Sequence, residues 1–572
     1  MKSDNVQSGA RILHDALVHE GVTVLFGYPG SDMLPFYDEL YHSSTIRHIL
    51  VRHEQAAAHA ADGYARSSGV PGVCMATSGP GSTNLITGIA AAYADSIPLV
   101  ALTFNASSEY LGKGVFQEVD MISITNTITK KNWRIRSVEE IPAIIHQAFY
   151  ESQKYPQGPV LIDIPSDIIR KNALGNVELE TMNDQGGRQS LSDVERAAFF
   201  SLLSQAKRPV FIAGSGIVQS QSHVMFRNLV ERLNVPVAST VSGVGSISEH
   251  HPLALEVLGV LGTPYANSAL QKADCIVAWG MHFEPRSTAR LEYFAPNAKI
   301  IQIDINHKAC GLFVQPTLCL SGDVSAIISD MLDDERSRAY RAPTEWIEQI
   351  ALWKHSCALR SDAAPSGIQP SFIMETLERI VPNIRIFAGN GLHKYWALRH
   401  FTYTYPRQFN TNSRFGAMGF ALPGAIGASI ALDEPIVVVT GDGDIQMNIQ
   451  ELATLADLST PVKILVFNNG SLGAIRQHQH FSYGKRFIGS TFDKPLAIAE
   501  IAQSYGIRSE TVGTHEYIQP ALERALHHPG PYLINFVLHP DTYLEKKISI
   551  NESLDALICP VEPIIDTRHD LA

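Results

Sequence analysis

Short apolar runs alternate with amphipathic stretches along the first third of the chain. The apolar runs include residues 23–26, 72–76 and 99–102, and they lead into glycine, serine or asparagine. Continuous apolar runs of this length are typical of strands that are buried on both faces of a parallel sheet. The pattern predicts a β/α domain from Val22 to about Ile164.

The same alternation returns twice further along the chain, between about 196 and 333 and again beyond 370. The strands expected there are residues 210–212, 275–277 and 299–303 in the second block, and 384–386, 436–440, 463–467 and 532–537 in the third. The repeated rhythm predicts the fold class α/β, with three doubly wound parallel-sheet domains.

Two polar stretches separate the three blocks. Residues 180–190 are polar and contain glycine, and residues 333–370 are charged and punctuated by proline and glycine, so both are interpreted as linkers. The predicted domains are residues 1–180, 191–340 and 365–550, followed by a tail at 551–572.

The composition is that of a globular protein without excess positive charge. Of the 572 residues, 45% are hydrophobic and 18% are charged, which favours large buried cores over disorder. Lys and Arg number 45 and Asp and Glu 57, so the formal net charge is −12. Such a protein lacks the positive field that attracts nucleic acid or an anionic membrane, and we expect neither as a partner.

The six cysteines are dispersed, with no C-x-x-C pair. Neither a disulfide framework nor a zinc site is expected. The first residues lead into an amphipathic helix, and no run of about 18 uncharged apolar residues occurs. We expect a cytoplasmic protein in a reducing environment.

Two polar residues follow neighbouring strands of the third block. Asp442 comes after the expected strand 436–440, and Asn469 follows the strand 462–467, 27 positions later. A right-handed crossover makes these strands parallel, so both residues lie at the edge where α/β sheets bind ligands. With the main-chain carbonyl of Ser471, their oxygens suit Mg²⁺ if phosphate oxygens complete the shell. Either motif alone is also typical of a turn after a strand, but together they favour a metal site.

This spacing of GDG and NN resembles the cofactor motif of the thiamine diphosphate enzymes. The neighbouring residues are similar to the large catalytic subunits of acetolactate synthases, from about residue 9 to about residue 537. The resemblance implies thiamine diphosphate and Mg²⁺ as cofactors and pyruvate as the donor 2-oxo acid. It also implies a homodimer or homotetramer, because in this family the cofactor lies between two subunits. It leaves open whether a separate regulatory subunit exists.

Glu54 begins an alanine-rich helix after the expected strand 48–52. An isolated glutamate in a first helical turn is commonly there to complement the helix dipole. The resemblance instead makes Glu54 the buried acid that protonates N1′ of the cofactor pyrimidine.

Further cofactor-binding residues are implied by loops that match the family, including the stretch 77–84, which resembles the family's TSGPGATN. Met418 stands where the family has the apolar wedge that bends thiamine, although a lone methionine is more typical of core filler. The cofactor-binding residues implied are Pro29, Gly30, Thr77, Gly79, Asn84, Asn390, Gly391, Leu392, His393, Gly416, Met418, Gly441, Asp442, Gly443, Asp444, Asn469, Ser471, Leu472, Gly473 and Ala474.

The acceptor pocket departs from the family. Where acetolactate synthases read L-G-M-V-x-Q-W-Q, this chain reads LGAIRQHQ at 472–479, so a methionine and a tryptophan have become Ala474 and His478. The lost apolar volume predicts a larger acceptor, and His478 adds a proton donor. The alternative is that neighbouring side chains refill the space. Gln117 and Lys130 match the family's catalytic residues.

Arg286 lines up with the family's arginine that contacts the flavin and the carboxylate of the second 2-oxo acid. Its neighbour Pro285 replaces the family's aspartate, and a surface ion pair is the alternative role. A Gly-x-Gly turn at 214–216 is typical of a pyrophosphate seat, which makes FAD a possible cofactor. Related thiamine enzymes without flavin keep the same domain, so this point stays open.

The expected activity is therefore a thiamine diphosphate- and Mg²⁺-dependent carboligase that decarboxylates pyruvate and transfers the acetaldehyde unit to a second 2-oxo acid. The alternative is a related carboligase or decarboxylase with a bulkier or non-acid carbonyl acceptor. A catalytically silent relative is disfavoured, because such a protein has no need for Glu54, Asp442 and Asn469 together.

Overall fold

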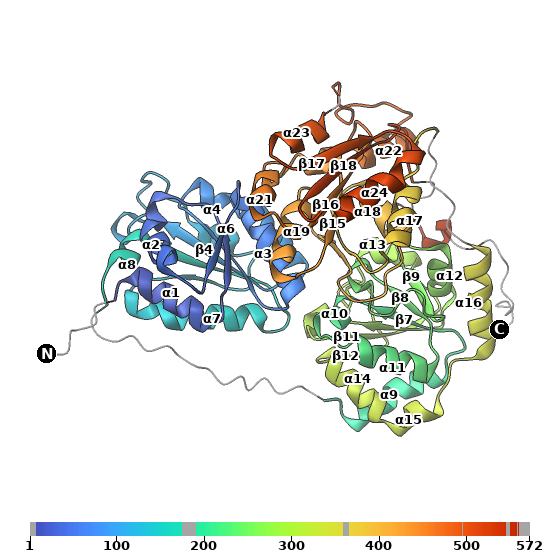
Figure 1. The fold of residues 1–572 in the computed structure, drawn as a ribbon. Helices are drawn as coiled ribbons and strands as arrows, with labels where there is room; N and C mark the ends of the chain where they lie inside the picture. Colours follow the sequence, from blue (N-terminus) through green and yellow to red (C-terminus); the bar gives the residue numbers. More distant parts are fainter. Residues whose placement is uncertain are drawn as a thin grey trace. The chain divides into compact units, whose positions relative to one another are not determined.

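The computed structural model describes residues 7–173, 190–357, 365–494, 496–544, 549–557 and 559. Three six-stranded, all-parallel sheets flanked by helices confirm the predicted fold class (Figure 1). The described parts of Met1–Asp184, Ile386–Lys394 and Thr411–Pro540 form one compact unit, and those of Gln185–Arg385, Tyr395–Asn410 and Asp541–Ala572 form a second. Within the described residues, no helix is long and apolar enough to cross a bilayer.

The first sheet has the strand order β2-β1-β3-β4-β6-β5. Its strands are β1 (Val24–Gly27), β2 (Arg47–Leu50), β3 (Gly72–Ala76), β4 (Leu99–Asn105), β5 (Asn132–Arg134) and β6 (Pro159–Pro165). Its helices are α1 (Gly9–His19), α2 (Leu34–His42), α3 (Glu54–Ser68), α4 (Pro80–Asn84), α5 (Ile86–Ala94), α6 (Met121–Thr125), α7 (Ile141–Gln153) and α8 (Ser166–Arg170). One hydrophobic core lies under α1, α2 and α7, and another lies under α3 and α5. Burial on both faces explains the uninterrupted apolar strands.

The C-terminal sheet has the order β14-β13-β15-β16-β18-β17. Its strands are β13 (Arg385–Ala388), β14 (Phe409–Thr411), β15 (Ile436–Gly441), β16 (Val462–Asn468), β17 (Arg508–Val512) and β18 (Tyr532–Val537). The helices α18 (Leu392–Arg399), α19 (Ala421–Ala431), α20 (Asp442–Ile445), α21 (Glu451–Leu458), α22 (Gly473–Ser482), α23 (Ile498–Ser504) and α24 (Ile518–His527) lie along this part of the chain. The preceding helix, α17 (Pro370–Ile380), belongs to the second unit.

Helices α3 and α19 cross at very short range and join the first and third sheets within one unit. A Cβ on Gly63 would overlap the main chain of Gly424, and a Cβ on Gly427 would overlap the carbonyl oxygen of Ala60. Glycine and alanine on both helices therefore permit a backbone-to-backbone contact that larger residues would prevent.

The central sheet belongs to the second unit and has the order β12-β11-β10-β7-β8-β9. Its strands are β7 (Pro209–Ala213), β8 (Val237–Ser239), β9 (Ala254–Val257), β10 (Cys275–Trp279), β11 (Lys299–Asp304) and β12 (Leu318–Ser321). Its helices are α9 (Asp193–Ser204), α10 (Ser215–Gln219), α11 (His223–Leu233), α12 (Pro264–Lys272), α13 (Pro285–Thr288) and α14 (Val324–Asp333).

Much of the stretch 333–370 is helical, unlike the predicted linker. It forms α15 (Glu335–Ala339) and α16 (Thr344–Ser356) before the undescribed residues 358–364. Trp346 and Trp353 lie on one face of α16, are buried, and pack edge to face at 5.7 Å. Trp346 also donates a hydrogen bond from Nε1 to the Pro209 carbonyl at 3.0 Å. The sequence analysis interpreted this stretch as a linker because it is charged, and so missed the buried tryptophan pair that anchors the helix. The other predicted linker, 180–190, lies outside the described residues apart from Ser190.

The described part of the tail packs on the second unit. A short 3-10 helix, η8 (Leu554–Leu557), lies against α12 and buries Leu554 and Leu557. The main-chain N–H of Cys559 donates to the Ser268 hydroxyl at 2.8 Å. The remaining tail residues lie outside the described part of the chain.

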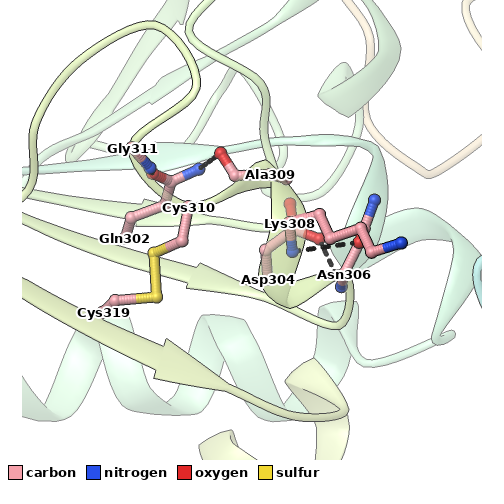
Figure 2. Close-up of a disulfide and its surroundings, with 8 residues drawn as sticks. All are labelled: Gln302, Asp304, Asn306, Lys308, Ala309, Cys310, Gly311 and Cys319. Atoms are coloured by element: carbon pink, nitrogen blue, oxygen red, sulfur yellow. Dashed lines mark hydrogen bonds between the residues drawn. A yellow bond between two sulfur atoms is a disulfide. The ribbon is translucent and has the colours of Figure 1, made fainter.

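Two disulfides contradict the expectation that the cysteines are unpaired. Cys310 pairs with Cys319, as Figure 2 shows, and Cys357 pairs with Cys559 across 202 positions. Gln302 lies beside Cys319 in the β11–β12 register. Its side chain donates a hydrogen bond to the Ala309 carbonyl and accepts one from the Gly311 N–H, on either side of Cys310. Strand pairing places Cys319 beside Gln302, and the hydrogen bonds of Gln302 hold the loop that carries Cys310, which the cysteine spacing alone could not reveal.

Candidate active site

Asp442, Asn469 and Ser471 meet at the carboxyl edge of the third sheet, as predicted. β15 and β16 run parallel with Gly441 opposite Phe467, so the residues after both strands emerge side by side. The Ser471 N–H donates to Asp442 Oδ2 at 3.1 Å, and its hydroxyl donates to Asn469 Oδ1 at 3.0 Å. All three side chains are buried. The arrangement concentrates hard oxygen ligands at one point.

Burial raises the pKa of Asp442 to about 7, although main-chain N–H groups of the two adjoining loops oppose the shift. A neighbouring cation would favour the ionised form of this carboxylate and so lower its pKa. The electrostatic environment therefore suits a bound cation.

His393 lies in a space walled by glycine at the same edge. A Cβ on Gly391 would come within 2.6 Å of the imidazole, and a Cβ on Gly441 within 2.8 Å. Burial lowers the pKa of His393 to about 4, so the ring is neutral at pH 7. Leu392 and His393 begin α18, whose first N–H groups favour anions. This corner of the edge can accept a phosphate.

The loop that carries Met418 joins the same edge. Asn390 donates a hydrogen bond from Nδ2 to the Gly416 carbonyl at 2.6 Å. Gly416 and Gly419 both have positive φ, which glycine adopts without strain. Met418 is half-buried between them, and its role as a wedge stays a prediction.

Glu54 is the first residue of α3 and is only 9% exposed. Asn84 donates from Nδ2 to Glu54 Oε2 at 2.9 Å. A Cβ on Gly81 would stand 3.1 Å from the other carboxylate oxygen. The structure thus brings the predicted acid to the 77–84 loop and fixes its orientation.

Thr77 and Gly79 form the rest of the Glu54 half-site, the part of the candidate site that the first sheet carries. The buried Thr77 hydroxyl has no hydrogen-bond partner within the described residues, and Gly30 leaves room for its side chain. Gly79 has a φ of +64° and packs against the Gln117 backbone, where a Cβ would be 2.9 Å from Cα. Gln117 Oε1 also lies 3.4 Å from the Ser78 hydroxyl. Pro29, by contrast, is exposed.

Lys130 does not join these residues. Its ammonium group donates to the main-chain carbonyls of Glu151 and Lys154 at the end of α7, and its own N–H pairs with Pro159 at the start of β6. That position is the amino end of the first sheet, opposite the end that carries Glu54. The structure therefore does not bring Lys130 to Glu54, and its catalytic role stays a prediction.

Ala474 and His478 lie one turn apart on α22, immediately after the Asn469–Ser471 loop. Ala474 is half-buried and His478 is exposed, with its ring packed edge to face on Tyr483 at 5.5 Å. A spacing of four residues places both substitutions on one face of this helix.

Arg286 lies in the second unit, on α13 after β10. Its side chain is exposed, and no ion pair involves it among the described residues. Its proposed contact with an acceptor stays a prediction.

Glu451 is a buried carboxylate that the sequence analysis missed. It accepts the Arg52 N–H at 3.0 Å and the Thr454 hydroxyl at 2.7 Å. Burial raises its pKa to about 7. Glu451 thus links α21 to the segment directly before Glu54. Its partner is a main-chain N–H far away in sequence, so only its position beside the apolar stripe of α21 could have drawn attention to it.

Models of known protein families match a segment of the chain in each of the three sheets. Residues 7–124 match the thiamine pyrophosphate enzyme N-terminal TPP binding domain, 196–331 the central domain, and 389–536 the C-terminal TPP binding domain.

Similar curated proteins extend over nearly the whole chain. The probable acetolactate synthase large subunit of Methanococcus aeolicus is 38% identical over 560 residues, covering 94% of this chain and 93% of that protein. The acetolactate synthase large subunit of Pyropia yezoensis is 36% identical and covers 92% and 91%, respectively. The chloroplastic acetolactate synthase of Arabidopsis thaliana is 37% identical and covers 93% and 82%. The chain belongs to the thiamine pyrophosphate enzymes and, within them, to the family of the acetolactate synthase large subunits.

Proposed function

We propose that this protein is a thiamine diphosphate- and Mg²⁺-dependent carboligase that decarboxylates pyruvate and joins the acetaldehyde unit to a second 2-oxo acid. The observation that carries the proposal is the preservation of both half-sites, the Asp442–Asn469–Ser471 oxygen set and the Glu54–Asn84 pair. The names of the relatives support the same reaction type.

The residues present fit Mg²⁺ and a diphosphate. Asp442, Asn469 and the Ser471 carbonyl would hold the metal, while neutral His393 and the first N–H groups of α18 would hold phosphate oxygens. The unpartnered Thr77 hydroxyl offers a further polar contact. Bound thiamine diphosphate would supply a carbon nucleophile for the keto carbon of pyruvate, with loss of CO₂.

Glu54 would hold a proton on N1′ of the pyrimidine. Asn84 keeps one carboxylate oxygen occupied, so the other remains available for that proton. Gly81 leaves the available oxygen unobstructed by a side chain.

The residues that suggested FAD do not fit a pyrophosphate seat. Gly214 and Gly216 donate their N–H groups to the carbonyls of Trp279 and Gly280. Their lack of a Cβ is explained by the same close packing against Gly280. No step of the proposed reaction uses a flavin, and the visible absorption spectrum of purified protein would reveal one.

The assembly and location belong to the same proposal. We infer a homodimer or homotetramer in the cytoplasm, with 2-oxo acids as small-molecule partners and with a regulatory subunit as an optional addition. Sedimentation at several protein concentrations would test the oligomeric state.

The decisive experiment is NMR product analysis with ¹³C-pyruvate, Mg²⁺ and thiamine diphosphate. Acetolactate is expected from the wild type and not from Glu54→Gln, which has nearly the same shape but cannot act as the acid. Folded Glu54→Gln protein with wild-type activity would contradict the assignment of the acid.

A bulkier or non-acid acceptor is the second candidate, favoured by Ala474 and His478 on one face of α22. If CO₂ forms with little acetolactate, the same assay should be repeated with larger aldehydes and ketones. The double substitution Ala474→Met and His478→Trp is expected to lower the yield with bulky acceptors by about tenfold, because it restores apolar volume. An unchanged product ratio would show that α22 does not select the acceptor.

A further inference from the structure

Asp444 connects three separate loops at the carboxyl edge of the third sheet. Its Oδ1 accepts the N–H groups of Asn390 at 3.0 Å and Gly419 at 3.1 Å. Its Oδ2 accepts the Thr440 hydroxyl at 2.7 Å. The side chain is 3% exposed. Both carboxylate oxygens are therefore committed to protein donors.

The surrounding chain is built to admit this carboxylate. A Cβ on Gly389 would overlap Asp444 Oδ2, so glycine is needed at that position. Lys394 is also buried and donates from Nζ to Asn390 Oδ1 at 2.8 Å. Lys394 lies on α18, so its hydrogen bond ties this helix to the same residue, Asn390, whose main-chain N–H Asp444 accepts.

Each of the three loops carries candidate cofactor residues. The first contains Asn390 and leads to His393, the second contains Met418, and the third contains Asp442. Asn390 also bonds to the Gly416 carbonyl, which closes the connection between the first two loops.

The family resemblance implied Asp444 as a cofactor-binding residue, but both of its carboxylate oxygens accept protein donors. We propose that Asp444 is instead a positioning residue that holds these three loops in register for thiamine diphosphate, without a side-chain contact to the cofactor. This inference rests on the proposed function. One side chain that accepts hydrogen bonds from Asn390, Gly419 and Thr440 can organise this edge of the sheet.

The test measures the Kd for thiamine diphosphate at saturating Mg²⁺ by calorimetry, using the full-length protein. Asp444→Ala is expected to raise this Kd by about 30-fold, because it removes the shared acceptor of two loops. Asp444→Asn keeps an oxygen for both N–H groups and is expected to recover most of the affinity, to within about fivefold of wild type. Thr440→Val removes only the hydroxyl donor and is expected to behave like Asp444→Asn.

Asp274→Ala is the matched control. Asp274 also accepts two main-chain N–H groups, those of Lys207 and Arg208, both at 2.8 Å, but it lies in the second unit. Its substitution is expected to lower Tm without changing the Kd. Wild-type cofactor affinity in folded Asp444→Ala, or an equal loss in Asp274→Ala, would overturn the positioning role. Failure of the wild type itself to bind thiamine diphosphate would instead overturn the proposed function.

Discussion

Glu451 and Asp442 are both buried carboxylates with raised pKa values, but their surroundings differ. Asp442 lies among oxygen atoms that suit a cation, whereas Glu451 is bonded to the Arg52 main chain and to Thr454. Glu451 thus links two segments of the same chain and is not placed to hold a ligand. We therefore expect its protonation to affect the free energy of unfolding.

Replacing Glu451 by glutamine is expected to change how stability depends on pH. Burial raises the Glu451 pKa from 4.5 to about 7, so between these values the folded state binds more protons than the unfolded state. Stability therefore falls as pH rises through this window, by about 3 kcal/mol from this group alone. The Glu451→Gln protein lacks that contribution. Urea unfolding from pH 4.5 to 8 would measure the difference.

The comparison is between wild type and variant at each pH, because Asp442 titrates in the same range and contributes equally to both. Parallel stability curves for the two proteins would show that Glu451 is not protonated in the folded state at neutral pH.

At the scale of elements, the α3–α19 crossing determines how the two ends of the chain combine. α3 begins at Glu54, and α19 follows the loop that carries Met418. Their contact passes through main-chain atoms at Gly63 and Gly427. This closely packed pair of helices therefore connects the Glu54 half-site to the half-site at the edge of the third sheet.

Gly427→Ala is expected to destabilise the first unit by about 3 kcal/mol, because its Cβ would overlap the Ala60 carbonyl and the helices would have to separate. Thermal unfolding would measure the loss. Gly513→Ala is the matched control, since nothing lies within 4 Å of a Cβ there. An equal Tm for both variants would argue against tight packing at the crossing.

Most elements could be predicted from the apolar pattern. Residues 72–76 and 532–537 were expected as strands and are β3 and β18 with the same bounds. The pattern failed for α16, because its charged face resembles a linker while Trp346 and Trp353 anchor the other face.

The candidate site could be predicted only in part. The pairing of Asp442 with Asn469 follows from strand order, whereas the contacts of Lys130, Glu451 and Asp444 depend on main-chain groups far away in sequence. The predicted domain limits stay predictions.

For the molecule as a whole, the six cysteines are expected to differ in reactivity. Cys319 is exposed, Cys357 and Cys559 are buried, and burial raises the pKa values of Cys74 and Cys275. Mild reduction of the native protein should therefore release Cys310 and Cys319 first, because a reductant can reach them. Differential alkylation with mass spectrometry would give the order. Earlier labelling of Cys74 or Cys559 would contradict the described burial.

The contact between α3 and α19 also limits how this chain can change over generations. Gly63 and Gly427 face main-chain atoms, which are present whatever side chain the opposite helix carries. A mutation that enlarges either glycine cannot be rescued by a smaller partner residue, because there is no partner side chain to shrink. Descendants of this sequence should retain both glycines even where helix α22 diverges. New substrate preferences can then arise without disturbing the junction that holds the two half-sites.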